Sequence, residues 1–392
     1  MKFLHMSDLH LGKVLNFFPL IEDQVHILEE IKKVIEAEQP DAIIIAGDIY
    51  DKRIASTDAI HLFDSFLEWL YTHNQTVFII SGNHDEQERL AVGRPVMAGA
   101  GIYISPVYDG TIRPITLTDA YGPVRIYMLP FLKATDVSCF YKEELEALNK
   151  QDKEKTESRK TTNAISLVCE KMQMDTSVRN VLVTHLAVKG GERSESEIEP
   201  IGGEENVDAS VFKDFDYVAL GHLHKEQTIG SERVCYSGSP LKYSMSERNY
   251  KKGVTIVEMG EKGSMPVLRQ VHLTPLHDMR ELSGRYMELM NKRFYEGKGY
   301  ENDYIRIVLT DEEEIPDAMA KLKTVYRNIM ELKYDNTRTR HIPQIMDITK
   351  HEQKKPLEVF SDFYKKMNGK EMDEKRIACI KALLNEMGED YT

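Results

Sequence analysis

The first eighty residues alternate between short apolar runs and longer amphipathic stretches. The runs at residues 2–6, 42–46 and 76–80 ("KFLHM", "AIIIA" and "TVFII") have the length and apolar content of buried strands. Between them, apolar side chains recur at helical spacing over residues 20–35 and 60–70, and Ser56 is a candidate N-cap for the second helix. This order predicts parallel strands covered by helices, a sheet whose ligands bind beyond the carboxyl ends of its strands.

The next part of the chain is richer in strands. Apolar runs follow one another over residues 103–129, and further strand-like runs occur at 179–185, 215–224, 234–240 and 252–259. The charged stretch at 141–160 reads as a helix with a solvated face, and the composition of residues 189–206 is that of a loop. We therefore predict two mixed sheets stacked between helices in a first unit that ends near Pro275.

The residues after this point predict a smaller second unit. Its expected elements are a helix over 279–290, a strand over 303–310, a helix over 318–326 and a strand near 330–334. Beyond residue 342 two amphipathic helical stretches, 357–367 and 374–387, have no room for a core of their own. We expect them to pack on a neighbour or on a partner chain. Two or three units are also what a chain of 392 residues allows.

Composition is that of a globular protein without membrane spans. The chain is 41% hydrophobic and 29% charged, and its longest apolar runs are far too short to cross a bilayer. The N-terminus reaches Asp8 before an apolar signal region could form, so we expect no secretory targeting. Four cysteines, Cys139, Cys169, Cys235 and Cys379, lie far apart without a C-x-x-C pair. Free thiols in a reducing compartment, and hence a cytoplasmic location, are expected.

The net charge of −13 argues against a protein that coats nucleic acid by bulk electrostatics. It does not exclude an enzyme that meets a phosphate backbone at one groove. Two bound divalent cations would add four positive charges at the site itself, where they would be the largest local charges.

Five short polar motifs fall where the predicted strands end: "SDLHLG", "GDIYD", "GNHD", "VTHL" and "GHLH". Each one alone has an ordinary structural explanation, such as a helix N-cap, a tight turn or a satisfied core histidine. In an extended segment residues i and i+2 project to the same side, so Asp8 with His10, and His222 with His224, can point into one pocket. The occurrence of all five at strand ends predicts a single site, whose candidate residues are Asp8, His10, Asp48, Asp51, Asn83, His84, His185, His222 and His224.

The donor atoms of this set indicate a metal site. Asp, Asn and His offer oxygen and imidazole nitrogen without thiolate, which suits Mn²⁺, Fe or Zn²⁺. Seven such ligands are too many for one ion and fit two ions that share a carboxylate at a spacing of roughly 3.5–4 Å. Paired ions at that spacing activate water and hold oxygens during displacement at phosphorus, so the pattern predicts phosphoester hydrolysis.

The motifs resemble those of the calcineurin-like metallophosphoesterase superfamily, D-x-H, G-D-x-x-D, G-N-H-D/E, H and G-H-x-H. Longer stretches, "HMSDLHLGK", "ISGNHDEQERL", "IGGEENVDASVFKDFDYVALGHLHKEQ" and "CYSGSPLKYSMSE", are similar to the SbcD family of bacterial nuclease subunits over essentially the whole chain. The resemblance implies a four-layer α-β-β-α sandwich over residues 1–275 and a small α+β capping domain over 276–342. It also implies a helical region over 343–392 that grips the coiled-coil base of an ATPase partner.

The resemblance also implies roles for the site residues. One metal would be bound by Asp8, His10, Asp48 and His224, and the other by Asp48, Asn83, His185 and His222, with Asp48 bridging. His84 would contact the scissile phosphate and assist the leaving oxygen, while Asp51 would orient His84. Some related repair nucleases carry a histidine at the Asp51 position, so its part in substrate handling stays open. His5 is expected to be a packed or hydrogen-bonded neighbour of the site.

By the same resemblance the chain is expected to be a Mn²⁺-dependent DNA nuclease subunit that forms a homodimer and does not bind membranes. It would act as a 3′–5′ exonuclease on duplex ends and as an endonuclease at hairpins and single strands, in DNA repair, recombination and replication. Its partner would be an SbcC-like ATPase with a coiled coil. The chain has no G-x-x-x-x-G-K-[ST] loop, so any ATP dependence must come from that partner. The residues themselves leave the polarity and the physiological metal open.

Several basic residues lie in loops next to the motifs, and each is either a backbone phosphate contact or an ordinary surface charge. They are Lys13, Lys52, Arg53, Arg89, Lys189, Lys225 and Lys242. Two other functions remain open. A small-molecule or cyclic-nucleotide phosphodiesterase or phosphatase on the same core would suit the acidic charge, but it leaves the residues after 275 unexplained. A non-catalytic scaffold should have lost one or more ligands, and here none is missing.

Overall fold

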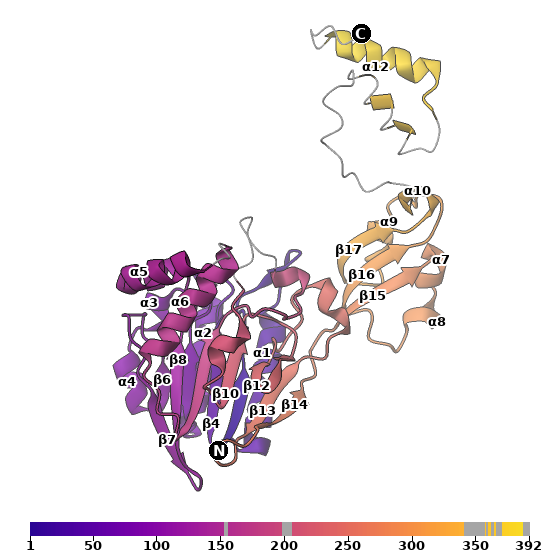
Figure 1. Cartoon of the computed structure of the whole chain (residues 1–392). Coiled ribbons are helices and arrows are strands. Elements are labelled where there is room, and N and C mark those ends of the chain that lie inside the picture. The colour runs from indigo at the N-terminus through magenta and orange to yellow at the C-terminus, as the bar shows by residue number, and fades with distance from the viewer. Residues whose placement is uncertain are drawn as a thin grey trace. The chain divides into compact units, whose positions relative to one another are not determined.

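The computed structural model describes residues 1–152, 156–197 and 206–340, with residues 357, 360, 361, 364, 365 and 371–386 of the C-terminal part. The chain divides into two compact units, Met1–Met279 and Arg280–Thr392 (Figure 1). The predicted boundaries at residues 275 and 342 stay predictions. All four cysteines are free thiols. Among the described residues, no helix combines the length and the apolar content needed to cross a membrane.

The first sheet of the large unit has six strands in the order β14-β13-β1-β4-β5-β6. These are β1 (Lys2–Met6), β4 (Ala42–Ala46), β5 (Val77–Ile80), β6 (Ile102–Ile104), β13 (Gly253–Glu258) and β14 (Val267–His272). Strands β1, β4, β5 and β6 are parallel, β13 pairs antiparallel with β1, and β14 pairs antiparallel with β13 at the edge. The parallel order predicted from the first eighty residues is confirmed.

Helices connect the parallel strands of this sheet. They are α1 (Ile21–Glu38), α2 (Thr57–Thr72), α3 (Gln87–Leu90) and α4 (Arg94–Gly99), and a small hairpin of β2 (Val14–Leu15) and β3 (Phe18–Pro19) precedes α1. Ser56 caps α2 as predicted, because its side chain accepts a hydrogen bond from the backbone N–H of Ala59. Phe63, Phe66 and Leu70 are buried from α2, whereas Ile60 in its first turn is 47% exposed.

The second sheet also has six strands, in the order β11-β12-β10-β9-β8-β7. They are β7 (Ile115–Asp119), β8 (Gly122–Leu129), β9 (Arg179–His185), β10 (Tyr217–Gly221), β11 (Gln227–Ile229) and β12 (Ser231–Tyr236). Between β8 and β9 the chain forms α5 (Ala134–Gln151) and α6 (Glu157–Lys171). Ile165 and Val168 of α6 pack in one apolar cluster with Leu182 and Leu220 of the sheet.

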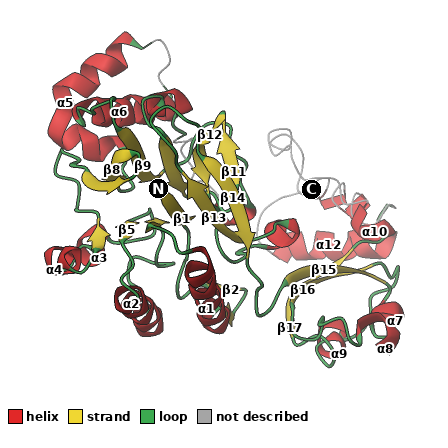
Figure 2. Cartoon of the chain, turned by 90° about the horizontal axis from the view of Figure 1, so that it is seen from below, coloured by secondary structure: helices red, strands yellow, loops and turns green. Residues whose placement is uncertain are grey.

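The two sheets pack face to face. Phe3, Ile44 and Phe78 of the first sheet share a buried cluster with Val183 and Ala219 of the second. Figure 2 shows α1 and α2 on the outer side of one sheet and α5 and α6 on the outer side of the other. The large unit is therefore the predicted four-layer α-β-β-α sandwich.

The smaller unit is built on a three-stranded sheet in the order β15-β16-β17. Its elements are β15 (Met279–Gly284), α7 (Tyr286–Leu289), α8 (Lys292–Tyr295), β16 (Tyr304–Leu309), α9 (Ala318–Leu322), β17 (Asn328–Tyr334) and α10 (Thr337–Arg340). Leu282, Leu289, Ile307, Leu322 and Tyr326 contribute to its core. This is the predicted α+β composition.

One predicted element of this unit is wrong. The helix expected over 279–290 is the strand β15 followed by the short helix α7. The apolar residues Met279, Leu282 and Leu289 recur at a spacing that fits a helix, but Met279 and Leu282 are the buried positions of β15 at the edge of the sheet. Tertiary pairing thus overrides the local pattern. The helix expected over 318–326 is shorter and ends at Leu322.

The C-terminal helical prediction is only partly within the described residues. Helix α12 (Glu374–Glu386) confirms the second predicted helix. The stretch 357–367 and the rest of the predicted partner-binding region 343–392 lie mostly outside the described residues, as do residues 198–205 of the predicted loop.

Candidate metal centre

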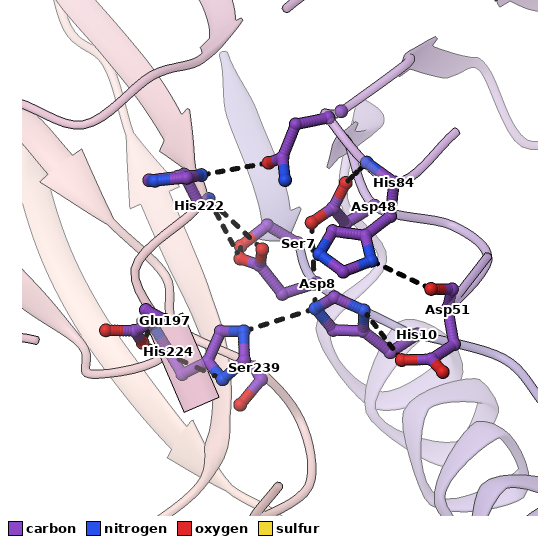
Figure 3. A network of polar contacts seen from close by, with 12 residues as sticks. Ser7, Asp8, His10, Asp48, Asp51, His84, Glu197, His222, His224 and Ser239 are labelled. Carbon is purple, nitrogen blue, oxygen red and sulfur yellow. Dashed lines mark hydrogen bonds and ion pairs between the residues drawn. The ribbon is translucent and has the colours of Figure 1, made fainter. Parts of the chain in front are cut away.

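The polar motifs of both sheets meet at the carboxyl ends of their strands. Residues following β1, β4, β5 and β10 point toward one another (Figure 3), and His185, the last residue of β9, lies 3.3 Å from Asp48. The structure brings together all seven predicted ligands, which are Asp8, His10, Asp48, Asn83, His185, His222 and His224. Three groups, Asp8–His10–His224, His10–Asp48–His84 and Asp8–Asp48–His185, each offer ligand atoms that lie within 4.8 Å of one another.

The backbone at the site is strained. Asp8, His10, Asp48 and His222 have φ angles of 55°, 44°, 49° and 105°, in the left-handed region that residues with a Cβ rarely adopt. Each such residue costs about 1–3 kcal/mol and persists only where the surroundings enforce it. Their concentration at the strand ends indicates a site whose side-chain placement matters more than local stability.

On one side of the site His10 faces His224. The Nε2 atoms of the two rings are 3.2 Å apart, and His10 Nε2 lies 3.6 Å from Asp48 Oδ2. Burial lowers the pKa of His10 well below its usual value. A neutral imidazole is the form that binds a metal, so this pair of nitrogens is suited to a shared cation.

On the other side His185 and His222 both lie against Asn83. The Asn83 Oδ1 atom is 3.1 Å from His185 Nε2 and 3.0 Å from His222 Nδ1. Burial lowers the pKa of His222 to about 3. Burial also acts to lower the pKa of His185, but the carboxylates of Asp48 and Asp8 outweigh it and raise that pKa to about 9. A cation held by these carboxylates would take the place of the His185 proton.

Asp48 lies between the two sides. Its Oδ2 atom is 3.3 Å from His185 Nε2 as well as 3.6 Å from His10, and its Oδ1 accepts a hydrogen bond of 2.9 Å from the backbone N–H of His84. A Cβ on Gly82 would lie 2.1 Å from Asp48 Oδ1, so this position requires glycine. Asp48 is therefore placed to be shared by two ions.

These residues fit a pair of divalent cations. Asp8, His10, Asp48 and His185 are all at most 2% exposed, and they bring carboxylates and imidazoles together in a buried space. Buried charges need a partner, and hard or borderline donors of this kind are suited to Mn²⁺, Fe or Zn²⁺. The predicted assignment of four ligands to each ion stays a prediction.

His84 lies at the edge of the site and is oriented through the backbone of Asp51. Its Nδ1 atom is 2.8 Å from the Asp51 carbonyl oxygen, and its ring packs edge-on against His10 with 4.8 Å between centroids. The Asp51 carboxylate instead accepts a hydrogen bond of 2.6 Å from Lys13 Nζ and lies 3.6 Å from His10 Nδ1. The predicted contact between the two motifs exists, but a main-chain carbonyl makes it.

A cavity of about 270 Å³ opens over these residues and is lined by His10, Asp48, Asn83, His84, His222 and His224. Three cationic side chains also line it, those of Arg53, Lys133 and Arg193. Only Arg53 was among the predicted phosphate contacts. Lys133 and Arg193 were missed because they lie neither next to the five motifs nor within the longer stretches of similarity.

The other predicted phosphate contacts do not line this cavity. Lys13 is paired with Asp51, Lys225 with Glu192 and Lys242 with Asp278. Lys52, Arg89 and Lys189 are exposed. The Lys225–Glu192 pair lies near the surface, where an ion pair is weak enough to be exchanged for a phosphate, whereas the side chains of Lys13 and Lys242 are only 15% and 13% exposed. All of these residues stay predictions rather than members of the site.

One residue that supports the site was not predicted from the sequence. Asp85 of "GNHD" is buried and accepts hydrogen bonds from the backbone N–H groups of Ile49, Tyr50 and Gly82, which joins the loops after β4 and β5. Burial raises the pKa of Asp85 to about 6. Its place in a motif was a signal that could have been used.

A second missed group lies behind His224 and consists of Ser196, Glu197, Glu247 and Lys252. No spacing pattern marks these residues in the sequence. His5 is the packed neighbour that was expected: it is buried, and its Nδ1 lies 2.8 Å from the Tyr217 hydroxyl.

Two protein families match the chain. The calcineurin-like phosphoesterase family matches residues 1–226, and the type 5 capsule protein repressor C-terminal domain matches residues 275–368. The chain is also 34% identical over 393 residues to SbcD, a subunit of the nuclease SbcCD, from Staphylococcus epidermidis, and the alignment covers 98% of both chains.

Solved structures with similarity to the chain include two hydrolases. The phosphopantetheinyl hydrolase of Mycobacterium tuberculosis is 17% identical with a TM-score of 0.35, over 69% of this chain and 95% of that one. A dimetal phosphatase of Danio rerio is 12% identical with a TM-score of 0.39, over 69% of this chain and 98% of that one. Similarity at this level says nothing about the substrate.

Proposed function

We propose that this chain, which belongs to the calcineurin-like phosphoesterases and within them to the SbcD family, is the nuclease subunit of a DNA-processing complex. Family membership makes it a metal-dependent phosphoesterase. The observation that carries the proposal is the convergence of seven oxygen and nitrogen ligands around Asp48, beside a cavity lined by cationic side chains. A scaffold that had lost its activity would not need this complete and strained set of ligands.

Two divalent ions, most simply Mn²⁺, would be held by the seven ligands. Asp8, His10, Asp48 and His224 would hold one, and Asp48, Asn83, His185 and His222 would hold the other. When bound, such a pair supplies the Lewis acidity for attack of water on phosphorus. Asp48 contributes by presenting one oxygen, Oδ2, to both halves of the site, at 3.3 Å from His185 Nε2 and 3.6 Å from His10 Nε2.

His84 would act on the substrate through its Nε2 atom. The Asp51 carbonyl can only accept a hydrogen bond, so His84 carries a proton on Nδ1 and donates it at 2.8 Å. The remaining nitrogen is then the one available to the substrate in the cavity. In the protonated ring it can donate to the leaving oxygen, as a general acid or as an electrostatic stabiliser.

The substrate would be the DNA backbone. Arg53, Lys133 and Arg193 line the cavity beside the ligands, where they can bind phosphates on either side of the scissile bond. The relative from Staphylococcus epidermidis is named as part of a nuclease, which supports DNA over a small phosphate ester. We extend this to 3′–5′ exonuclease activity on duplex ends and endonuclease activity at hairpins and single strands, in DNA repair, recombination and replication in the cytoplasm.

An SbcC-like ATPase with a coiled coil would be the partner, bound through residues 343–392. Membership in a family named for one component of a complex supports this assignment. Co-purification with such an ATPase tests it directly. We also propose that two copies of the chain associate, which light scattering of the purified protein measures.

A cleavage assay with two substrates tests the nuclease proposal. Labelled hairpin DNA and a chromogenic phosphate ester are each incubated with the protein and Mn²⁺. The proposal requires DNA cleavage, and it fails if the protein hydrolyses only the ester or neither substrate.

Replacing His84 tests the site. His84→Ala should reduce DNA cleavage by about two orders of magnitude or more, in the range expected for loss of an acid or of a transition-state donor. Folding and Mn²⁺ binding should be retained, because His84 is not among the seven proposed ligands. His61→Ala, at an exposed position of α2, is the matched control. Unchanged cleavage by His84→Ala would remove this residue from the mechanism.

A further inference from the structure

The His224 ring is held from behind by a chain of two side chains. Its Nε2 faces His10, and its Nδ1 lies 2.9 Å from Ser196 Oγ and, at the longer distance of 3.4 Å, from Glu247 Oε1. The same Ser196 oxygen is 2.6 Å from Glu247 Oε1. His224 thus stands between the proposed metal position on one side and Ser196 and Glu247 on the other, and Figure 3 shows its ring facing that of His10.

Donor and acceptor rules fix the direction of this chain. Glu247 is paired with Lys252 at 2.5 Å, and its carboxylate can only accept hydrogen bonds. Ser196 Oγ also lies 2.6 Å from the Ser194 hydroxyl, which can donate to it, so Ser196 can give its single O–H to Glu247. The serine oxygen then accepts the Nδ1–H of His224. With the proton on Nδ1, the lone pair of His224 lies on Nε2, the nitrogen that points toward His10.

Glu247 and Lys252 are both buried, and burying their charges costs free energy. Their contacts with His224 give a reason for that cost. Glu247 is 0% exposed and Lys252 is 8% exposed. Burying an ion pair costs several kcal/mol per ion before the attraction between the charges offsets it. Apolar residues of similar size in the same place often make a fold equally stable or more stable. Lys252 also donates to the backbone carbonyl of His224 at 2.7 Å, so the pair holds both the ring and the main chain of that residue.

The chain of hydrogen bonds joins three separate segments. Ser196 lies in the 3₁₀ helix η1 (Glu195–Glu197) after β9, and Glu247 lies in η3 (Met245–Asn249) after β12. Glu197 accepts a hydrogen bond from the backbone N–H of His224. The loop after β9 is therefore part of the support of a residue that follows β10.

We propose that Ser196 and Glu247 form a relay that holds His224 in the tautomer and orientation needed for metal binding. They are positioning residues, since they act through His224 rather than on the substrate. The inference deepens the proposed function, because it rests on His224 being a metal ligand. It predicts that the two proposed metal positions respond differently when the relay is broken.

The expected effect is a loss of affinity at one of two positions. Loss of the hydrogen-bond partner behind a ligating histidine lowers metal affinity about 10–100-fold. Ser196→Ala and Glu247→Gln should each weaken one Mn²⁺ binding step by that factor and leave the other step unchanged. Both side chains act through the same His224 ring, so their effects should not add. The double variant should bind Mn²⁺ at this step about as tightly as the single variant with the lower affinity.

Calorimetric titration of the metal-free full-length protein with Mn²⁺ measures both steps without any substrate. Ser246→Ala is the matched control, because the Ser246 hydroxyl is hydrogen-bonded to the Glu195 backbone N–H and to the Ser244 hydroxyl rather than to His224 or the Glu247 carboxylate. It should change either step less than about threefold, and a larger loss at the same step would assign the effect to loop anchoring instead. Thermal unfolding of each variant shows whether the fold is retained.

The possible results separate the relay from the nuclease proposal. Two unchanged steps, or two equally weakened steps, in Ser196→Ala would overturn the relay even if Glu247→Gln fails to fold. A wild-type protein that binds two Mn²⁺ ions but cuts no DNA would contradict the nuclease proposal without contradicting the relay. A wild-type protein that binds fewer than two ions would overturn the relay.

Discussion

His185 and His224 lie on opposite sides of Asp48, and the protein holds them in different ways. The Nδ1 of His185 lies 2.8 Å from the backbone carbonyl of Ala46, at the end of β4. The Nδ1 of His224 reaches the side chain of Ser196 and, through it, Glu247. One histidine is thus fixed by the main chain of the sandwich and the other by side chains of two loops. The first support cannot be changed by a side-chain substitution at its acceptor, whereas the second can.

Packing around His185 is correspondingly tight. A Cβ on Gly47 would lie 2.4 Å from His185 Nδ1, and one on Gly221 would lie 2.6 Å from the same atom. Gly47 also has a φ of +87°, which favours glycine. The two sheets therefore approach each other at this point as closely as their backbones allow. The half of the site around His185 is a product of the fold, and the half around His224 depends on additional contacts.

Removing the carboxylate that both halves share should have the largest effect. Asp48→Asn takes the negative charge away from His10 and His185 together, so we expect both Mn²⁺ steps to weaken and DNA cleavage to fall by about three orders of magnitude or more. Titration with Mn²⁺ and the hairpin assay measure the two effects. Asp41→Asn, at an exposed carboxylate directly before β4, is the control. Retention of one tight binding step would show that Asp48 serves only one half.

A glycine substitution should break the His185 half selectively. In Gly221→Ala the new Cβ would lie 1.9 Å from the Ala46 carbonyl oxygen that orients His185. Overpacking of this kind lowers the free energy of unfolding by about 1–3 kcal/mol. We expect that loss in urea unfolding, together with weakening of the Mn²⁺ step that Ser196→Ala leaves intact. Gly99→Ala is the control, because nothing lies within 4 Å of its Cβ position. Weakening of the same step as in Ser196→Ala would contradict the division into two halves.

The ligands of the site and the side chains that support them differ in how far the sequence predicts them. Asp8 and His10 follow an apolar run directly, and the rule that parallel strands end at one edge brings them to Asp48 and Asn83. The local pattern is sufficient to predict this convergence of ligands, because each ligand is a polar residue at the end of a strand. It also predicts the four layers, since these depend on the order of strands and helices.

The support of the His224 half has no such signal. Ser196 is 28 residues from His224 and 51 residues from Glu247, and no periodicity joins them. Contacts between loops depend on where the sheets place those loops, which a local pattern does not contain. The same reason explains why Lys133 and Arg193 were missed, and why the pattern predicts a helix where β15 pairs with β16.

The smallest effect is expected from a change that leaves the main chain in place. Asp51→Asn removes the carboxylate near His10 and Lys13 but keeps the carbonyl that accepts the Nδ1–H of His84. Asparagine can still accept a hydrogen bond from Lys13, so we expect DNA cleavage to fall less than about tenfold, far less than in His84→Ala. Rates on hairpin DNA for the two variants, measured side by side, make the comparison.

If Asp51→Asn and His84→Ala lose the same cleavage rate, the Asp51 carboxylate takes part in the reaction. The main-chain carbonyl would then not be what orients His84. The pH dependence of the Asp51→Asn rate sharpens the comparison. If the carbonyl alone sets the His84 tautomer, the pH profile should keep its shape, because the group that holds the ring is not titratable. A profile that changes shape in Asp51→Asn but not in Asp41→Asn would show that the carboxylate acts on His84 after all.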